Sequence, residues 1–207
     1  MKINKPKIKY LEEYDLYKAY LDNYFNGYEF NAVNKEFTIS NVMFDGCVFN
    51  NCDFNNVVFE DVEMIDCVFN NCDLSNKVFD NKFISRCEFN SCKMMGVSFI
   101  GSNIKDILII NSNLRYINFS EASLSNVIIN DSDLSNMSFL STKLNNIEFY
   151  DVNLDNSEIS STKMKGIDLS SCSLFNLMID LFSLKGVIID RMQSENLVRM
   201  LGVEFKE

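Results

Sequence analysis

Hydrophobic residues recur along this chain of 207 residues with a period of five. Counted in fives from Ile39 to Ile189, all 31 positions are Phe, Leu, Ile or Met, and we call this the central position. The residue two places earlier is mostly small or medium-sized and apolar, and the other three are mostly Asn, Asp, Ser, Lys and Glu. Strict alternation would predict a β-strand, and a period of 3.6 a helix. A sustained period of five with two inward positions instead predicts a solenoid, in which each repeat buries its apolar face against its neighbours.

The length of one coil follows from a repeated decapeptide. The sequence CVFNNCDFNN at 47–56 returns twenty residues later as CVFNNCDLSN at 67–76. Four repeats per turn give a square coil, so that residues twenty apart stack about 4.8 Å apart through parallel β-sheet hydrogen bonds. Long apolar columns fit this arrangement, among them Phe59, Phe79, Phe99, Phe119 and Phe139. We therefore predict nearly eight coils over residues 37–192.

The seven cysteines raise the question of a metal site, because paired cysteines can hold zinc. The first four are separated by four, fourteen and four residues, which is not the spacing of zinc ribbons or knuckles. All seven fall two places before a central position: Cys47, Cys52, Cys67, Cys72, Cys87, Cys92 and Cys172. A buried column explains this period, since Cys packs as a small apolar side chain. We therefore predict structural cysteines, with no metal and no cofactor.

Five short motifs resemble the pentapeptide-repeat family, whose pattern is a small residue, then Asp or Asn, then Leu or Phe. They are CDF at 52–54, CDL at 72–74, SNL at 112–114, SDL at 132–134 and VNL at 152–154. The resemblance covers roughly residues 37–192. It implies an all-β fold, a right-handed quadrilateral β-helix. A repeat pattern of this kind says much about fold and little about function.

The N-terminal segment, residues 1–36, is expected to cap the first coil, because exposed edge strands of a solenoid recruit other chains. Its apolar residues recur at steps of three and four: Tyr10, Tyr14, Tyr17, Leu21 and Tyr24. This spacing predicts a short amphipathic helix over about residues 10–25, ended by the Asn-Gly pair at 26–27. A partner-binding tyrosine stripe is the alternative.

The C-terminal segment, residues 193–207, follows the last repeat and is expected to form a second short helix. Ser194 is a candidate N-cap and Gly202 a candidate stop. Its apolar residues either fold back as a cap or form a two-fold interface, which is the commonest arrangement in oligomers. The residues concerned are Leu197, Val198, Leu201, Val203 and Phe205.

The net charge of −10 is concentrated in the solenoid, where residues 37–192 carry 20 acidic and 11 basic residues. Acidic residues gather on or beside two sides of the square, which predicts an acidic strip: Asp53, Asp73, Asp131, Asp133, Glu148, Asp151 and Asp155. Lysines gather on another side. One interpretation is a solvated surface that keeps the protein soluble. The other is a rod whose acidic strip imitates the DNA backbone, since direct binding of nucleic acid would bring like charges together.

An acidic pentapeptide solenoid of this length that ends in a short apolar helix is similar to the Qnr-type quinolone-resistance proteins. The resemblance implies a homodimer joined through its C-terminal helices into a rod that mimics DNA. Such a rod binds DNA gyrase or topoisomerase IV and protects it from fluoroquinolones. The register runs from 39 to 189 without a net insertion, so the chain is similar to members that lack projecting loops. The alternative is an interaction scaffold with an unknown partner.

Composition argues against an enzyme. The chain has no His, the commonest general base, and no GxGxxG or P-loop motif. A filled bore would offer no pocket. The unpaired cysteines, the lack of an apolar run of about 18 residues and the lack of a secretory signal favour the cytoplasm.

Lys77 and Lys82 interrupt the apolar pattern at two consecutive inward positions. A buried, unpaired lysine is costly. We therefore expect a backbone bulge that turns both amines outward.

Overall fold

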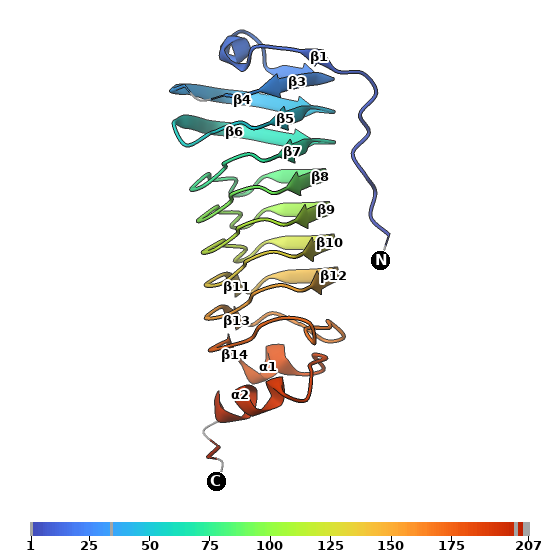
Figure 1. Cartoon of the computed structure of the whole chain (residues 1–207), viewed down its shortest axis with the longest axis vertical. Helices are drawn as coiled ribbons and strands as arrows, with labels where there is room; N and C mark the ends of the chain where they lie inside the picture. The colour runs from blue at the N-terminus through green and yellow to red at the C-terminus, as the bar shows by residue number, and fades with distance from the viewer. Residues whose placement is uncertain (1, 34, 201–202, 205–207) are drawn as a thin grey trace.

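The protein is a rod of stacked square coils (Figure 1). The structure is a computed structural model that describes residues 2–33, 35–200 and 203–204. The strands are β1 Glu12–Glu13, β2 Tyr24–Asn26, β3 Tyr28–Asn31, β4 Phe37–Asp45, β5 Val48–Asn50, β6 Val57–Ile65, β7 Val68–Asn70, β8 Phe83–Asn90, β9 Asn103–Ile110, β10 Ser123–Asn130, β11 Ser138–Leu140, β12 Lys143–Tyr150, β13 Glu158–Ser160 and β14 Met178–Ile179. The helices are a 3₁₀ helix, Leu16–Leu21, and the α-helices α1 Leu181–Leu184 and α2 Gln193–Met200.

The predicted twenty-residue register is confirmed. Strand β4 pairs in parallel with β6 so that Ile39 faces Phe59, and β10 pairs with β12 so that Val127 faces Ile147. The stacking starts before residue 37, because β2 and β3 pair with β4 and β5 with an offset of nineteen residues. The N-terminal segment therefore contributes strands to the first coil.

The central positions fill the bore with columns of side chains. The ring of Phe69 lies between those of Phe49 and Phe89, with centroids 4.5 Å and 5.0 Å away and nearly parallel planes. A second column stacks Phe79, Phe99 and Phe119 at 5.4–5.5 Å. Burial of these large rings is the main source of stability in the solenoid.

In many coils the position two before the centre holds Cys, Ser or Thr, whose side chain donates a hydrogen bond to the preceding coil. Cys67 Sγ donates to Phe44 O at 3.4 Å, and Thr142 Oγ1 donates to Phe119 O at 2.9 Å. All seven cysteines are buried and free, which confirms the buried column. A thiol or hydroxyl fits here because it is small and can satisfy a buried carbonyl.

The N-terminal helix differs from the prediction. Residues 16–21 form a 3₁₀ helix, whereas residues 12–13 and 24–26 are strands. The tyrosine spacing has another cause: the Tyr14 ring packs on Phe25, Tyr28 and Phe30 at centroid distances of 4.9–6.3 Å. Pairing of the flanking residues with the first coil outweighs the helical pattern.

The C-terminal helix forms but begins earlier than predicted. It starts at Gln193, so Ser194 lies inside it and its hydroxyl donates to Arg191 O at 2.6 Å. Gly202, the predicted stop, lies outside the described residues. Among the described residues, none of the helices has the length and apolarity needed to cross a membrane.

Lys77 points inward, which contradicts the expected bulge. Its side chain is buried, and Nζ donates to Val57 O at 2.8 Å and to Asn55 O at 3.3 Å. In the next coil, Ser98 N donates to Lys77 O at 2.9 Å, so the ladder resumes at once. The Lys77 ammonium therefore bonds to Val57 O in the place of a backbone N–H from the next coil. Lys82 does reach the surface, where it pairs with exposed Asp61.

Candidate functional site

Four acidic residues of the predicted strip come together on two successive coils. Asp133 is bridged to Asn153 in the next coil, and Asp131 N donates to Tyr150 O at 3.0 Å, directly before Asp151. Asp131 and Asp151 are exposed, whereas Asp133 and Asp155 are half-buried. We call Asp131, Asp133, Asp151 and Asp155 the acidic cluster.

Asp53 and Asp73 share a column with Asp133 but lie apart from the acidic cluster. The column runs through Asp53, Asp73, Lys93, Asn113, Asp133, Asn153 and Ser173. Lys93 Nζ lies 3.8 Å from Asp73 Oδ2. At about 4.8 Å per coil, Asp73 and Asp133 are about 14 Å apart along the rod. The predicted strip is therefore interrupted by one lysine and one asparagine.

Several of these carboxylates also close the turns from which they project. The Oδ1 atoms of Asp53, Asp73 and Asp133 each accept the backbone N–H two residues later, at 2.9–3.0 Å. Asn113 and Asn153 make the same bond in other coils, at 3.2 Å and 2.9 Å. Because Asp and Asn are equivalent in such turns, the fold does not require the acid. The choice of Asp over Asn therefore sets the surface charge.

Glu148 lies on a neighbouring side of the coil, in β12. It is half-buried, and its Oε2 accepts the Tyr150 hydroxyl at 2.9 Å. With Lys163 and Asp168 it lines a groove of about 890 Å³ between β12 and residues 163–171. This groove is lined by both charges, so Glu148 does not extend the acidic cluster.

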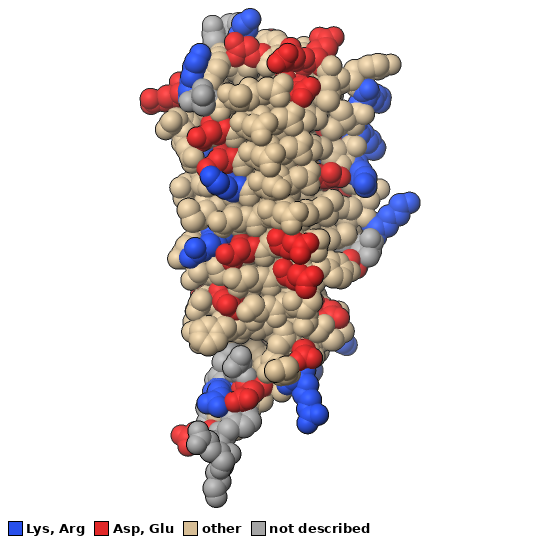
Figure 2. Space-filling view, in the orientation of Figure 1, with Lys and Arg blue, Asp and Glu red and all other residues tan. Residues whose placement is uncertain are grey.

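The face drawn in Figure 2 is mostly uncharged. Acidic side chains form small separate groups on it, and basic side chains lie toward its edges. On this face the acidic residues therefore form local clusters and no continuous strip.

Helix α2 packs against the last coil of its own chain. Leu197 is buried, and Gln193 Nε2 donates to Leu169 O at 2.9 Å and to Cys172 O at 2.7 Å. Val198 is half-buried and Val203 is exposed. Leu201 and Phe205 lie outside the described residues. These contacts favour the interpretation of α2 as a cap.

An exposed apolar surface at the C-terminal end was missed by the sequence reasoning. Leu181 and Phe182 in α1 are 68% and 62% exposed, and Met192 before α2 is 86% exposed. Figure 1 shows α1 and α2 together at this end of the rod. The sequence shows only part of this signal. Leu181 is apolar at an outward position, but Phe182 stands two places before the centre Leu184, where an inward side chain is expected. In the structure Phe182 is exposed and Ser183 is buried instead. We call Leu181, Phe182 and Met192 the apolar end.

Comparisons with known proteins identify the repeats and the fold. The family model described as a pentapeptide repeat region matches residues 42–119 and 62–139. Full-length QnrB1, a plasmid-mediated fluoroquinolone resistance protein, is 23% identical, with 94% of this chain and 97% of that chain covered and a TM-score of 0.54. HetL, a pentapeptide repeat protein involved in heterocyst differentiation regulation from the cyanobacterium Nostoc, is 12% identical, with 78% and 87% covered and a TM-score of 0.48. A search of the curated proteins finds no match.

The repeat match, the confirmed register and the likeness to QnrB1 agree on one architecture. Residues 42–139 lie within the stacked coils that the strand pairing defines. Residues 42–139 are therefore a pentapeptide-repeat region, and the chain as a whole has a fold similar to that of QnrB1.

Proposed function

We propose that this protein is a non-enzymatic DNA mimic that binds a type II topoisomerase, DNA gyrase or topoisomerase IV, and protects it from quinolones or a toxin. The observation that carries the proposal is an acidic rod of stacked coils whose fold resembles that of a fluoroquinolone resistance protein over most of its length. The proposed place of action is the cytoplasm, where both the enzyme and reduced cysteines would be found.

The acidic cluster supplies the charge that mimicry needs. Phosphates of one DNA strand recur about every 3.4 Å along the axis, and equivalent carboxylates on successive coils recur about every 4.8 Å. Asp131 and Asp151 are such a pair, with Asp133 and Asp155 beside them. A basic groove built for DNA would attract four carboxylates on two coils, while duplex DNA itself would be repelled. Asp53, Asp73 and Glu148 are proposed as secondary contacts.

We also propose that two rods join end to end. The apolar end exposes large side chains where the solenoid stops, and Val198 and Val203 lie in the segment that follows. Exposed apolar groups of this kind mark interaction surfaces, and a two-fold contact would bury the same patch on both copies. Leu197, Leu201 and Phe205 remain part of the predicted interface, although Leu197 already packs within its own chain.

A supercoiling assay tests the proposal. Purified gyrase or topoisomerase IV is assayed with and without a quinolone, over micromolar concentrations of this protein. We expect recovery of supercoiling or decatenation in the presence of the drug, and reduced DNA cleavage. Unchanged activity in both conditions, together with no binding by the enzyme, would remove the topoisomerase from consideration.

An interaction scaffold with another protein partner is the second candidate. It is favoured by the interruption of the acidic column at Lys93 and by the mostly uncharged face in Figure 2. The two candidates differ in salt dependence, because binding through a charge cluster weakens as ionic strength rises.

A further inference from the structure

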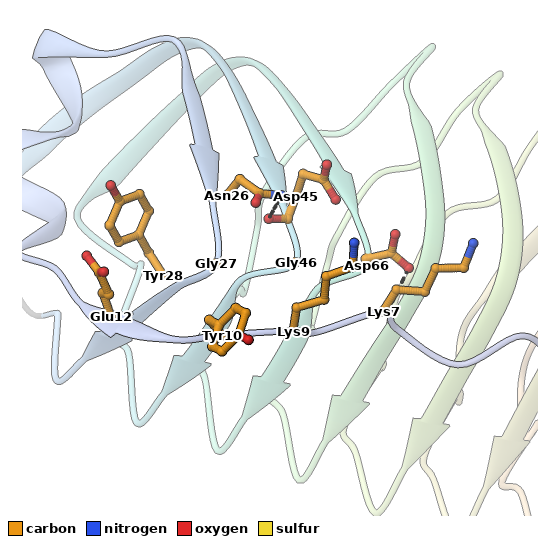
Figure 3. A pocket seen from close by; sticks show the side chains of 10 residues that line it. All are labelled: Lys7, Lys9, Tyr10, Glu12, Asn26, Gly27, Tyr28, Asp45, Gly46 and Asp66. Atoms are coloured by element: carbon orange, nitrogen blue, oxygen red, sulfur yellow. Dashed lines mark hydrogen bonds between the residues drawn. The ribbon is translucent and has the colours of Figure 1, made fainter.

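The N-terminal residues form an extended arm that crosses one corner of the coils (Figure 3). Residues 2–11 precede β1 and run opposite to the direction in which the coils advance, as Figure 1 also shows. Ile3, Pro6 and Ile8 are half-buried, whereas the lysines are exposed. The arm carries four positive charges and no acidic residue: Lys2, Lys5, Lys7 and Lys9.

The corner beneath the arm is a column of equivalent residues on successive coils. We call it the corner column, and it consists of Gly27, Gly46, Asp66, Arg86 and Asp106. Each adopts a positive φ between 53° and 75°, the left-handed region that turns a corner. Asp66 and Asp106 are 5% and 2% exposed, so their carboxylates are buried at the foot of the arm.

Every third residue of the arm meets the corner column. Asn4 donates to Asp106 through its backbone N (3.3 Å to Oδ1) and its side-chain Nδ2 (3.1 Å to Oδ2). Lys7 N donates to Asp66 Oδ1 at 2.9 Å. Tyr10 O lies so close to Gly27 that a Cβ there would approach it to 2.8 Å. Each of these three arm residues therefore contacts the corner column through a main-chain atom.

The spacing of these contacts follows from two regular structures. Three residues of extended chain span about 10 Å, and two coils of the solenoid span about 9.6 Å. Asp66 and Asp106 are separated by forty residues, which is two coils, and Gly27 lies two coils before Asp66. Every second corner of the column can therefore meet every third residue of an extended chain.

The corner column differs from its own continuation where the arm does not reach. The next two corners are Asn126 and Asn146. Asn146 Nδ2 donates to Asn126 Oδ1 at 3.1 Å, and Asn126 Nδ2 donates to Asp106 Oδ1 at 3.0 Å, so Asp106 ends this run of side-chain bonds and also accepts from the arm. Beneath the arm, Gly27 leaves room for the Tyr10 carbonyl, and the carboxylates of Asp66 and Asp106 accept N–H groups of the arm. Arg86 Nε and a second Arg86 nitrogen bind Asp66 at 2.6 Å, which balances one buried charge without blocking Lys7 N. The column thus has the composition of a binding site for a chain segment.

We propose that the corner column is a binding site for an extended, basic polypeptide segment, which residues 4–10 of the same chain occupy and which a basic segment of a partner protein can occupy in exchange. The arm is suited to exchange because it is attached at Asn4 and Lys7, while strand pairing begins at Glu12. Pro6 favours the extended conformation and lies between the donors, so its missing N–H is not needed. This site is separate from the acidic cluster and does not depend on the proposed topoisomerase binding.

Peptide binding to the full chain tests the proposal. The probe is a fluorescent peptide with the sequence of residues 2–10, and the receptor is the double variant Asn4→Pro plus Lys7→Pro, which removes both backbone donors of the attached arm. We expect saturable binding at least tenfold tighter than to the wild type. Adding Asp66→Asn and Asp106→Asn should weaken it at least tenfold. The matched control is Lys5→Pro, which keeps both donors and should behave as the wild type.

Two results would overturn the proposal. One is a folded double variant that takes up no peptide at concentrations up to about 1 mM. The other is equal binding after the two Asp→Asn changes, because this would show that the peptide binds away from the corner column. Hydrogen exchange on the unmodified chain gives an independent readout: the amides of Asn4 and Lys7 should exchange more slowly than those of Lys5 and Lys9. Equal exchange rates would mean that the arm is not seated on the column.

Discussion

Phe69 shows how a single central residue stabilises the rod. Its ring is 1% exposed and stacks on rings in the coils above and below. Removing it would leave a cavity between two coils that cannot collapse, because the ladder of backbone hydrogen bonds fixes their separation. The cost of such a change is therefore near the upper end of core substitutions.

We predict that Phe69→Ala lowers the free energy of unfolding by about 3–5 kcal/mol. The control is Phe175→Ala, because Phe175 is 58% exposed and a surface change should cost less than about 0.5 kcal/mol. Thermal and urea unfolding followed by circular dichroism would measure both. Equal transition midpoints would contradict a core held by ring columns.

The central and cysteine positions were predictable at this scale because their period and size identify stacked columns directly. Lys77 was not. Its aliphatic stem fills an inward position and its ammonium bonds to Asn55 O and Val57 O. Burial lowers the pKa of Lys77, although Asp73 and Asp53 act in the opposite direction. The Lys77 ammonium can be buried because it has these two backbone carbonyls to bond. The five-residue pattern does not show which carbonyls are left without a backbone N–H partner, because that depends on the local shape of one coil.

Among the elements, α1 depends most clearly on one side chain. Asp180 is its N-cap, and its Oδ1 accepts Ser183 N at 2.6 Å. Its Oδ2 accepts Ser161 N at 2.7 Å and Ser160 Oγ at 3.1 Å from the preceding coil. One carboxylate therefore joins the apolar end to the solenoid.

We predict that Asp180→Ala destabilises the C-terminal end by about 1–2 kcal/mol at neutral pH. The backbone N–H of Ser161, followed by that of Ser183, lowers the pKa of Asp180 to about 2. A lowered pKa means that the stabilisation is complete above the ordinary value of about 3.9 and is lost as pH falls toward 2. The difference in melting temperature between wild type and variant should shrink over this range. Glu158→Ala is the control, because Glu158 is an exposed neighbour in β13. If the difference in melting temperature between wild type and Asp180→Ala did not change with pH, the Asp180 carboxylate would not be the stabilising group.

The sequence predicted the two ends less well than the coils. Helical spacing at the N-terminus reflected tyrosines that cover the first coil from a 3₁₀ turn and short strands. At the C-terminus the helix was predicted correctly, but Leu197 faces its own solenoid. Local periodicity identifies an apolar face and cannot say whether the same chain or another one covers it.

At the scale of the whole molecule, the acidic cluster makes a prediction about binding. Charge reversal of Asp131, Asp133, Asp151 and Asp155 to Lys should weaken topoisomerase binding at least tenfold and remove its salt dependence. The matched variant replaces all four by Asn, which preserves the turn chemistry and should give an intermediate affinity with an unchanged β-type spectrum. Affinity that is the same in all three proteins would locate the contact elsewhere.

In our proposal, the apolar end determines whether two chains can join into a longer rod. Nearly eight coils at about 4.8 Å each give a rod of about 38 Å, so a long DNA mimic requires two chains joined end to end. Leu181 and Phe182 are exposed within one chain, whereas Leu197 is 5% exposed. Substitutions at these two places should therefore have different consequences.

We expect Leu181→Asp plus Phe182→Asp to give a monomer with a little-changed melting temperature, because neither side chain packs in the core. Leu197→Asp should instead lower the melting temperature, since it places a charge beneath α2. Light scattering and thermal unfolding of the two variants, beside the wild type, separate the outcomes. A wild type that is already monomeric, or a dimer that survives the first variant, would place any interface away from the apolar end. The topoisomerase contact would then have to be made by a single rod.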